Sequence, residues 1–89
     1  MLVYLISYDL HKPIKDYPDL YTTIQDLGDW AHALDSVWFV DTSLELLQVN
    51  DLILKTVDKD DNYFVLPVTK LPIGHLSDTV LGWLNSNVG

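Results

Sequence analysis

The chain opens with an apolar run that stops abruptly at a carboxylate. Residues 2–8 are almost all apolar, include the β-branched Val3 and Ile6, and are followed at once by Asp9. A short run of this kind is typical of a buried strand in the centre of a sheet. We therefore predict that Asp9 is held at the end of a rigid central strand. There its carboxylate either binds a metal, substrate or partner, or simply caps the following turn.

The next stretch predicts a helix followed by a hairpin. Apolar residues recur at helical spacing between Pro18 and Gly28, which favours a first helix over residues 17–27. A short run at residues 30–34 and the run at residues 37–40, which is rich in β-branched and aromatic residues, then flank the turn residues Asp35 and Ser36. The strands expected on either side of this turn are residues 30–34 and 37–40.

The second half of the chain predicts another helix, a strand and a final helix. Thr42 or Ser43 is a candidate cap for a helix whose apolar face recurs until it ends before Lys59. Residues 63–70 alternate as in a strand, and Pro67 within them favours a strand at the edge of the sheet. Ser77 is a candidate cap for the last helix.

The order of these elements predicts an α+β fold of the ferredoxin-like class. Strand, helix, strand, strand, helix, strand is the split βαβ sandwich, written βαββαβ, here with an added C-terminal helix. We expect one domain over residues 1–89, with residues 71–89 forming a C-terminal arm or lid. In this topology the end of the first strand, the hairpin turn and the loop before the last strand share one edge of the sheet. The polar residues expected there are Asp9, Asp35, Ser36, Asp58, Asp60 and Asp61.

Carboxylates gathered at one edge are expected to raise one another's pKa or to recruit a hard cation such as magnesium, manganese or calcium. For the acidic run at residues 58–61 a solvated turn is favoured over a ligand set, because nothing fixes the spacing of its side chains. The three histidines are not spaced as metal ligands. His11 is close to Asp9 in sequence, so it is either a proton-transfer group or a surface histidine.

Charge argues against a general nucleic-acid-binding surface. Thirteen acidic residues face five lysines and no arginine, for a net charge of −8, whereas affinity for phosphate backbones comes largely from Lys and Arg. The absence of cysteine excludes disulfides and thiolate metal sites. We expect a cytoplasmic protein with no membrane segment, because the amino terminus lacks a signal-peptide pattern and the apolar run from Leu2 is far too short to span a bilayer. A core of this size is marginal alone, and a dimer would stabilise it.

Several motifs resemble a known family. Tyr8-Asp9 closes the first strand and Ser36-Val37-Trp38 opens the second strand of the hairpin, as in the small CRISPR-associated second Cas protein, Cas-two. Residues 4–10, 28–32 and 34–38 look closer still to a Cas-two-like group, some of whose members carry a "SinR family" label. Virulence-associated protein D toxins, which are ribonucleases, share this fold. The match covers residues 1 to about 70.

The resemblance implies a ferredoxin-like homodimer that cleaves RNA or DNA with magnesium or manganese. Asp9 matches the metal-binding, catalytic aspartate of the family, and each subunit contributes one copy to an interfacial site. Ser36 matches the polar hairpin position that would orient water or phosphate. Tyr8, Lys12 and Trp38 are the expected substrate-binding residues. Each has an alternative: Tyr8 is buried packing, Lys12 is a solvated loop lysine rather than one that offsets charge, and Trp38 fills the core rather than stacking a base.

One departure from the family matters for function. The basic loop and helix that follow the aspartate in Cas-two are here reduced to Lys12 and Lys15, so charge on a transition-state phosphate would fall almost wholly to the metal. An alternative function is therefore a catalytically inactive acidic dimer that binds a protein partner or imitates nucleic acid. A third is a toxin or antitoxin-like regulator in which the terminal helix covers the Asp9 edge.

Overall fold

The opening apolar run forms a strand in the middle of the sheet. β1 (Leu2–Asp9) pairs antiparallel with β3 (Val37–Thr42) on one side and with β4 (Asn62–Pro67) on the other. Both edges of β1 are paired, and its alternate residues Tyr4, Ile6 and Tyr8 point to one face of the sheet, where all three are buried in the main core. The predicted position of this strand is confirmed.

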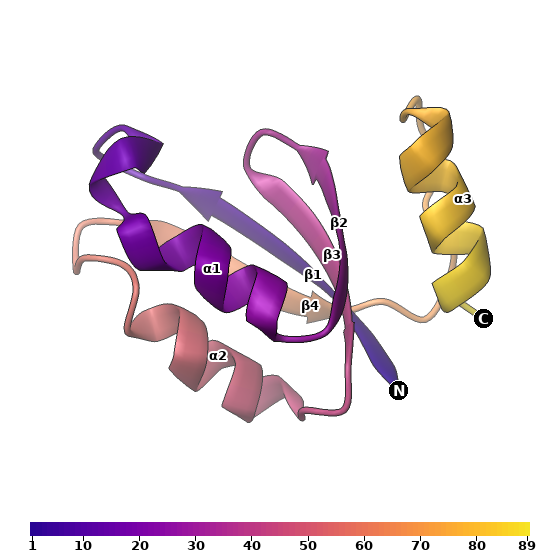
Figure 1. Cartoon of the computed structure of the whole chain (residues 1–89), viewed down its shortest axis with the longest axis horizontal. Helices are drawn as coiled ribbons and strands as arrows, with labels where there is room; N and C mark the ends of the chain where they lie inside the picture. Colours follow the sequence, from indigo (N-terminus) through magenta and orange to yellow (C-terminus); the bar gives the residue numbers. More distant parts are fainter.

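The computed structural model describes all residues from 1 to 89 and shows an α+β fold (Figure 1). The four strands form one antiparallel sheet in the order β2-β3-β1-β4. With three helices, this arrangement is compatible with a ferredoxin-like βαββαβ fold plus a C-terminal helix, as the sequence predicts. The remaining elements are β2 (Asp29–Leu34), α1 (Pro18–Asp26), α2 (Leu46–Leu54), α3 (Asp78–Asn87) and a single 3-10 turn, Ile14–Asp16.

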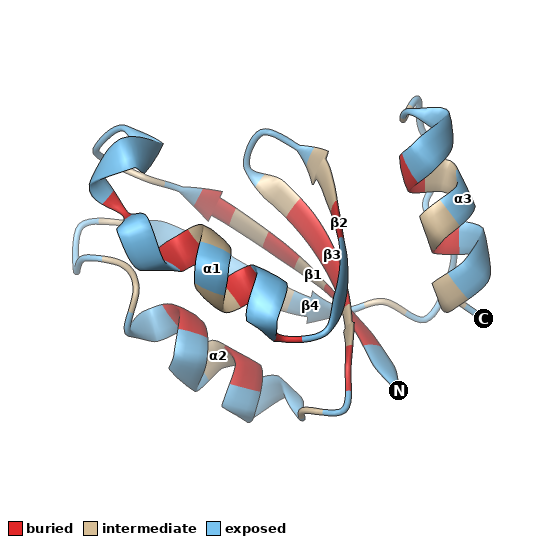
Figure 2. Cartoon of the chain, viewed as in Figure 1, coloured by how far each residue is buried: buried red, intermediate tan, exposed pale blue.

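The main core lies between the sheet and the helices α1 and α2. Leu20 and Ile24 of α1 and Val49 and Ile53 of α2 are completely buried against it. Figure 2 shows the buried residues of both helices on the sides that face the sheet. The strands contribute the alternate residues Tyr4, Ile6, Tyr8, Trp38 and Val40. None of the helices combines the length and apolar character that crossing a membrane requires.

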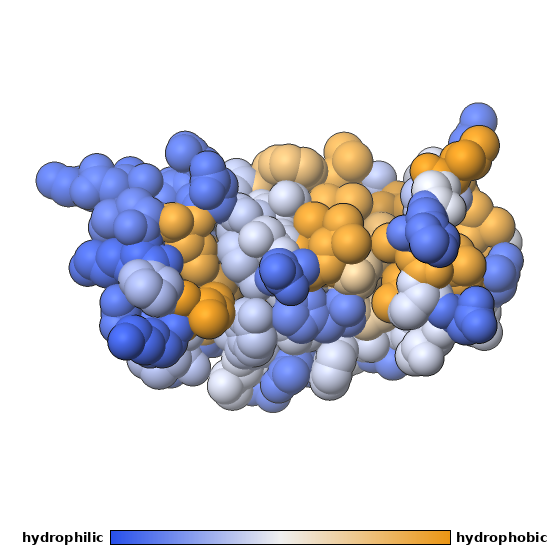
Figure 3. Space-filling model, turned by 90° about the horizontal axis from the view of Figure 1, so that it is seen from above, coloured by the Kyte–Doolittle hydropathy of each residue, from blue (hydrophilic) through white to orange (hydrophobic).

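The other face of the sheet is only partly covered. α3 stands apart from α1 and α2 (Figure 1) and packs Val80 and Leu84 against Phe39, which forms a second, smaller core. Phe64 and Leu66 of β4 remain 54% and 52% exposed. Figure 3 looks onto the top of the molecule as drawn in Figure 1, and it shows apolar surface in the middle and at the α3 end. One face of the sheet is therefore covered by α1 and α2, whereas α3 covers only part of the other face.

The second helix begins later than predicted. Thr42 belongs to β3, where it lies opposite Leu2, and it is therefore not the cap. Glu45 is the N-cap instead, and it forms a capping box in which its backbone N–H donates to Oε1 of Gln48 at 2.9 Å. The reciprocal pairing of Glu45 and Gln48 stabilises the later start.

The ends of α2 and β4 also differ from the prediction. α2 ends at Leu54 rather than just before Lys59, because both the N–H and the hydroxyl of Thr56 donate to the Ile53 carbonyl and close the last turn. β4 ends at Pro67 rather than at residue 70, although the N–H of Val68 still donates a hydrogen bond to the backbone carbonyl of Val3 at 2.8 Å. The predicted edge position of this strand is confirmed, since β4 is the last strand of the sheet.

Candidate functional site

Asp9 lies exposed at the end of β1, next to a hollow of about 400 Å³. Tyr8, Lys12 and Ser36 line the same hollow, which we call the Asp9 pocket. A smaller hollow of about 240 Å³ adjoins it and is lined by Asp9 together with residues such as Phe64. The structure therefore brings together four of the five residues expected to bind metal or substrate or to act in catalysis, and the fifth is Trp38.

The hairpin turn is tied to the end of β1 by two hydrogen bonds. The backbone N–H of Tyr8 donates to the carbonyl of Ser36 at 3.1 Å, and the Tyr8 hydroxyl donates to the carbonyl of Asp35 at 3.2 Å. These bonds hold the exposed side chain of Ser36 beside the strand end that carries Asp9. The predicted convergence of β1 and the hairpin turn at one edge follows from the antiparallel topology.

Trp38 is placed in the core rather than in the Asp9 pocket. Its ring is 1% exposed, is stacked by His32 with ring centroids 3.9 Å apart, and meets the edge of Tyr21. Its Nε1 donates to the hydroxyl of Tyr8 at 3.1 Å, and burial raises the pKa of Tyr8 to about 12. A nucleic-acid base could reach this ring only if the covering side chains moved.

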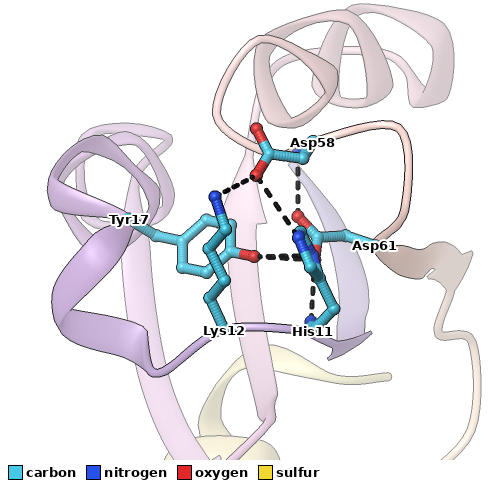
Figure 4. Close-up of polar contacts among 5 residues, drawn as sticks. All are labelled: His11, Lys12, Tyr17, Asp58 and Asp61. Carbon is cyan, nitrogen blue, oxygen red and sulfur yellow. Dashed lines mark hydrogen bonds and ion pairs between the residues drawn. The ribbon is translucent and has the colours of Figure 1, made fainter.

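A second group of polar side chains, which sequence reasoning did not find, joins the loop after β1 to the loop before β4. His11, Tyr17, Asp58 and Asp61 point toward one another (Figure 4), and we call them the loop cluster. Oδ1 of Asp61 accepts hydrogen bonds from the His11 backbone N–H at 2.9 Å and from the Tyr17 hydroxyl at 2.7 Å. Nδ1 of His11 lies 2.6 Å from the same oxygen. Oδ2 of Asp61 accepts from the backbone N–H of Asp58 at 2.7 Å.

These contacts decide the ionisation of the cluster. Burial alone would raise the pKa of Asp61, but the hydrogen bonds from His11, Tyr17 and Asp58 hold the pKa of this carboxyl well below its usual range. Burial, together with the bond to ionised Asp61, raises the pKa of Tyr17 to about 12. The expectation that gathered carboxylates raise one another's pKa is therefore wrong for Asp61.

The loop cluster contacts the Asp9 pocket through Lys12. The Lys12 ammonium lies 3.5 Å from Oδ2 of Asp58, and Nε2 of His11 lies 3.8 Å from the same oxygen. One ligand atom each from His11, Asp58 and Asp61 lies within 4.8 Å of the others, so this group could hold a metal ion. The sequence carries no signal for the grouping, because His11 and Asp61 are fifty positions apart. Asp60 takes no part in it.

No protein-family model and no curated protein matches this chain. The similarity to Cas-two-like proteins therefore remains an expectation from short motifs. The fold adds the placement of those motifs: Tyr8 and Asp9 end the central strand, and Ser36 lies beside them in one pocket.

Proposed function

We propose that the chain acts as a Cas-two-like homodimer that hydrolyses phosphodiester bonds in RNA or DNA, with a magnesium or manganese ion held by Asp9 from each of two copies. The observation that carries this proposal is the Asp9 pocket, which gathers an exposed carboxylate, the Ser36 residue and the Lys12 ammonium at a rigid strand end. Asp35 also lines this pocket, but the proposed metal site takes one Asp9 from each copy, so it needs the second copy.

The open sheet face supports the pairing of two copies. Alternation along β1 turns Tyr8 toward the helices, so Asp9 belongs to the opposite face, together with Leu5. Phe64 and Leu66 of β4 are exposed on that face. Two copies that pair across it would bury this apolar surface and bring the two Asp9 carboxylates to a shared boundary.

The residues of the pocket fit a hydrolytic role. A hard divalent cation suits carboxylate oxygen and, when bound, would polarise phosphate and lower the pKa of water. The hydroxyl of Ser36 would orient the attacking water or a phosphate oxygen. Lys12 would leave Asp58 and place its ammonium near the departing oxygen, where positive charge offsets the negative charge that develops.

The decisive experiment compares Asp9→Asn with Asp26→Asn. Asp26 is an exposed acid at the end of α1 that does not line the pocket, so the two variants change the net charge equally. Labelled single-stranded RNA and DNA are incubated with each purified protein and magnesium, manganese or a chelator. We expect metal-dependent cleavage that falls about a hundredfold or more in Asp9→Asn and is unchanged in Asp26→Asn. Cleavage that survives the chelator, or that is equal in the two variants, would contradict the proposal.

A second candidate function is a catalytically inactive acidic dimer that binds a protein partner by imitating nucleic acid. The excess of thirteen acids over five lysines favours it, since Lys12 is already paired with Asp58. This function predicts no cleavage under any metal condition. It also predicts that a partner captured by the protein is released by added DNA.

A further inference from the structure

The outer edge of β2 leaves main-chain groups without a partner strand. β2 is an end strand of the sheet. The hydrogen bond from the Tyr8 N–H to the hairpin turn sets the alternation of the ladder, so that Phe39 of β3 bonds toward β2. Ala31 lies opposite Phe39 and bonds inward, so the N–H and carbonyl groups of Trp30 and His32 point away from the sheet. An edge of this kind is a template for another strand.

A groove of about 620 Å³ lies between this edge and α3. Residues 29–32 of β2 form one wall, and α3 contributes the other, including Trp83 and Asn87. Nε1 of Trp83 is buried and has no hydrogen-bond partner. A buried donor without an acceptor is costly, and Trp83 must turn this N–H into the groove for a peptide carbonyl to accept from it.

Two aspartates, Asp29 and Asp41, lie opposite each other at the start of this edge, and no cation is paired with either. Asp29 lines the groove and lies directly opposite Asp41 of β3, so both side chains are on one face of the sheet. Neither aspartate forms an ion pair, and Oδ1 of Asp41 is buried without a partner. The ion pairs of the chain lie elsewhere, at His11 and Lys12. A ligand with a positive side chain would supply the missing counter-charge.

We propose that the groove between β2 and α3 binds an extended basic peptide of a partner protein, which adds to β2 as a fifth strand. Main-chain hydrogen bonds to Trp30 and His32 fix the peptide along the edge. A Lys or Arg of the peptide lies near Asp29 and Asp41, and a peptide carbonyl accepts from Nε1 of Trp83. The groove does not include Asp9, so this inference stands or falls independently of phosphodiester hydrolysis.

The first test uses a short fluorescent peptide of alternating lysine and valine, with a matched peptide of alternating glutamate and valine. We expect the anisotropy of the lysine peptide to rise to saturation, and affinity for the glutamate peptide to be at least about tenfold weaker. In NMR spectra of the full chain, the backbone amides of Trp30 and His32 and the indole N–H of Trp83 should shift on binding. The amide of Asp9 should not.

Two pairs of variants separate strand addition from general charge attraction. Trp30→Pro removes an outward N–H that β3 does not use. Trp30→Val removes the same ring but keeps this N–H. The peptide should therefore bind about tenfold more weakly to the proline variant than to the valine variant. Asp29→Asn should weaken binding several-fold. Asp19→Asn, which removes the same charge from an exposed position on α1, should leave it unchanged.

Several outcomes would overturn the proposal. These are no binding of the lysine peptide, equal binding of both peptides, and equal losses in Asp29→Asn and Asp19→Asn. A dimer that dissociates in Trp30→Pro without any peptide present would assign the edge to a second copy of this chain instead. If Trp30→Pro does not fold, the NMR shifts and the two aspartate variants decide the question.

Discussion

Nδ1 of His11 lies 2.6 Å from Oδ1 of Asp61, a side chain with no exposed surface and fifty positions later in the chain. The contact fastens the loop after β1 to the loop before β4 (Figure 4). Lys12, next to His11, lines the Asp9 pocket and also reaches Asp58. The shape of the pocket on this side therefore depends on how firmly the two loops are held together.

Replacing Asp61 should destabilise the protein in a pH-dependent way. The pKa of folded Asp61 is below its usual value of 3.8, so the ionised carboxylate contributes stability above about pH 4, and this contribution is lost as the pH falls through the folded pKa. We expect Asp61→Asn to lower the melting temperature by several degrees at neutral pH. The difference from wild type should shrink in acid. Thermal unfolding followed by circular dichroism across this pH range measures both effects.

The matched control for this prediction is Asp60→Asn, because Asp60 is the exposed neighbour of Asp61. It removes the same charge without touching the loop cluster, and we expect little change in melting temperature at any pH. If the two variants lose equal stability, or if the Asp61→Asn difference grows in acid, the hydrogen bonds to Asp61 do not control its ionisation.

Gly28 is expected to be intolerant of a side chain, because a Cβ there would overlap the backbone carbonyl oxygen of Asp41. The Gly28→Ala variant should lose about 1 to 3 kcal/mol of unfolding free energy, as overpacked sites do. Gly82 on α3 has open space at the same position, so Gly82→Ala should instead gain about 0.5 to 1 kcal/mol. Urea unfolding of both variants measures this contrast, and equal effects would mean that Gly28 does not approach β3 closely.

The docking of α3 can be tested at Leu84, which is 1% exposed and packs in the second core with Phe39. Leu84→Ala should lower the free energy of unfolding by about 2 to 5 kcal/mol, whereas Leu47→Ala, at a position that is 74% exposed, should lower it hardly at all.

Removing residues 71–89 should expose Phe39 and give an aggregating protein. If α3 packs on a neighbouring subunit instead, Leu84→Ala will make dissociation of the dimer easier as well as lower its stability.

The fold could be predicted because its signals are periodic and local. The apolar run of β1, the helical spacing before Gly28 and the turn at Asp35 each specify an element without reference to distant residues. The convergence of Asp9 and Ser36 then followed from strand direction alone. The start of α2 was missed because several residues before it are good caps. Thr42 is not a cap because it is paired with β1 as part of β3. Glu45 is the cap because it forms a capping box with Gln48.

The loop cluster could not be predicted because its contacts depend on loop conformation rather than on periodicity. The acidic run before β4 looks like a solvated turn, yet Asp61 within it is turned inward, where it accepts hydrogen bonds from His11 and Tyr17, which follow β1. The burial of Trp38 has a similar origin. His32 and Tyr21 cover its ring, and they come from β2 and α1, whose relative position the sequence pattern does not give.

The pairing of Asp9 with Asn62 in the β1–β4 ladder has a kinetic consequence. The β1–β4 pair is among the most widely separated in sequence, so its loop-closure entropy opposes early formation. The His11–Asp61 contact needs that pair in place, so we expect it to form only after the folding barrier has been crossed. Breaking it should then leave the refolding arm of a chevron plot where it is and shift only the unfolding arm to faster rates.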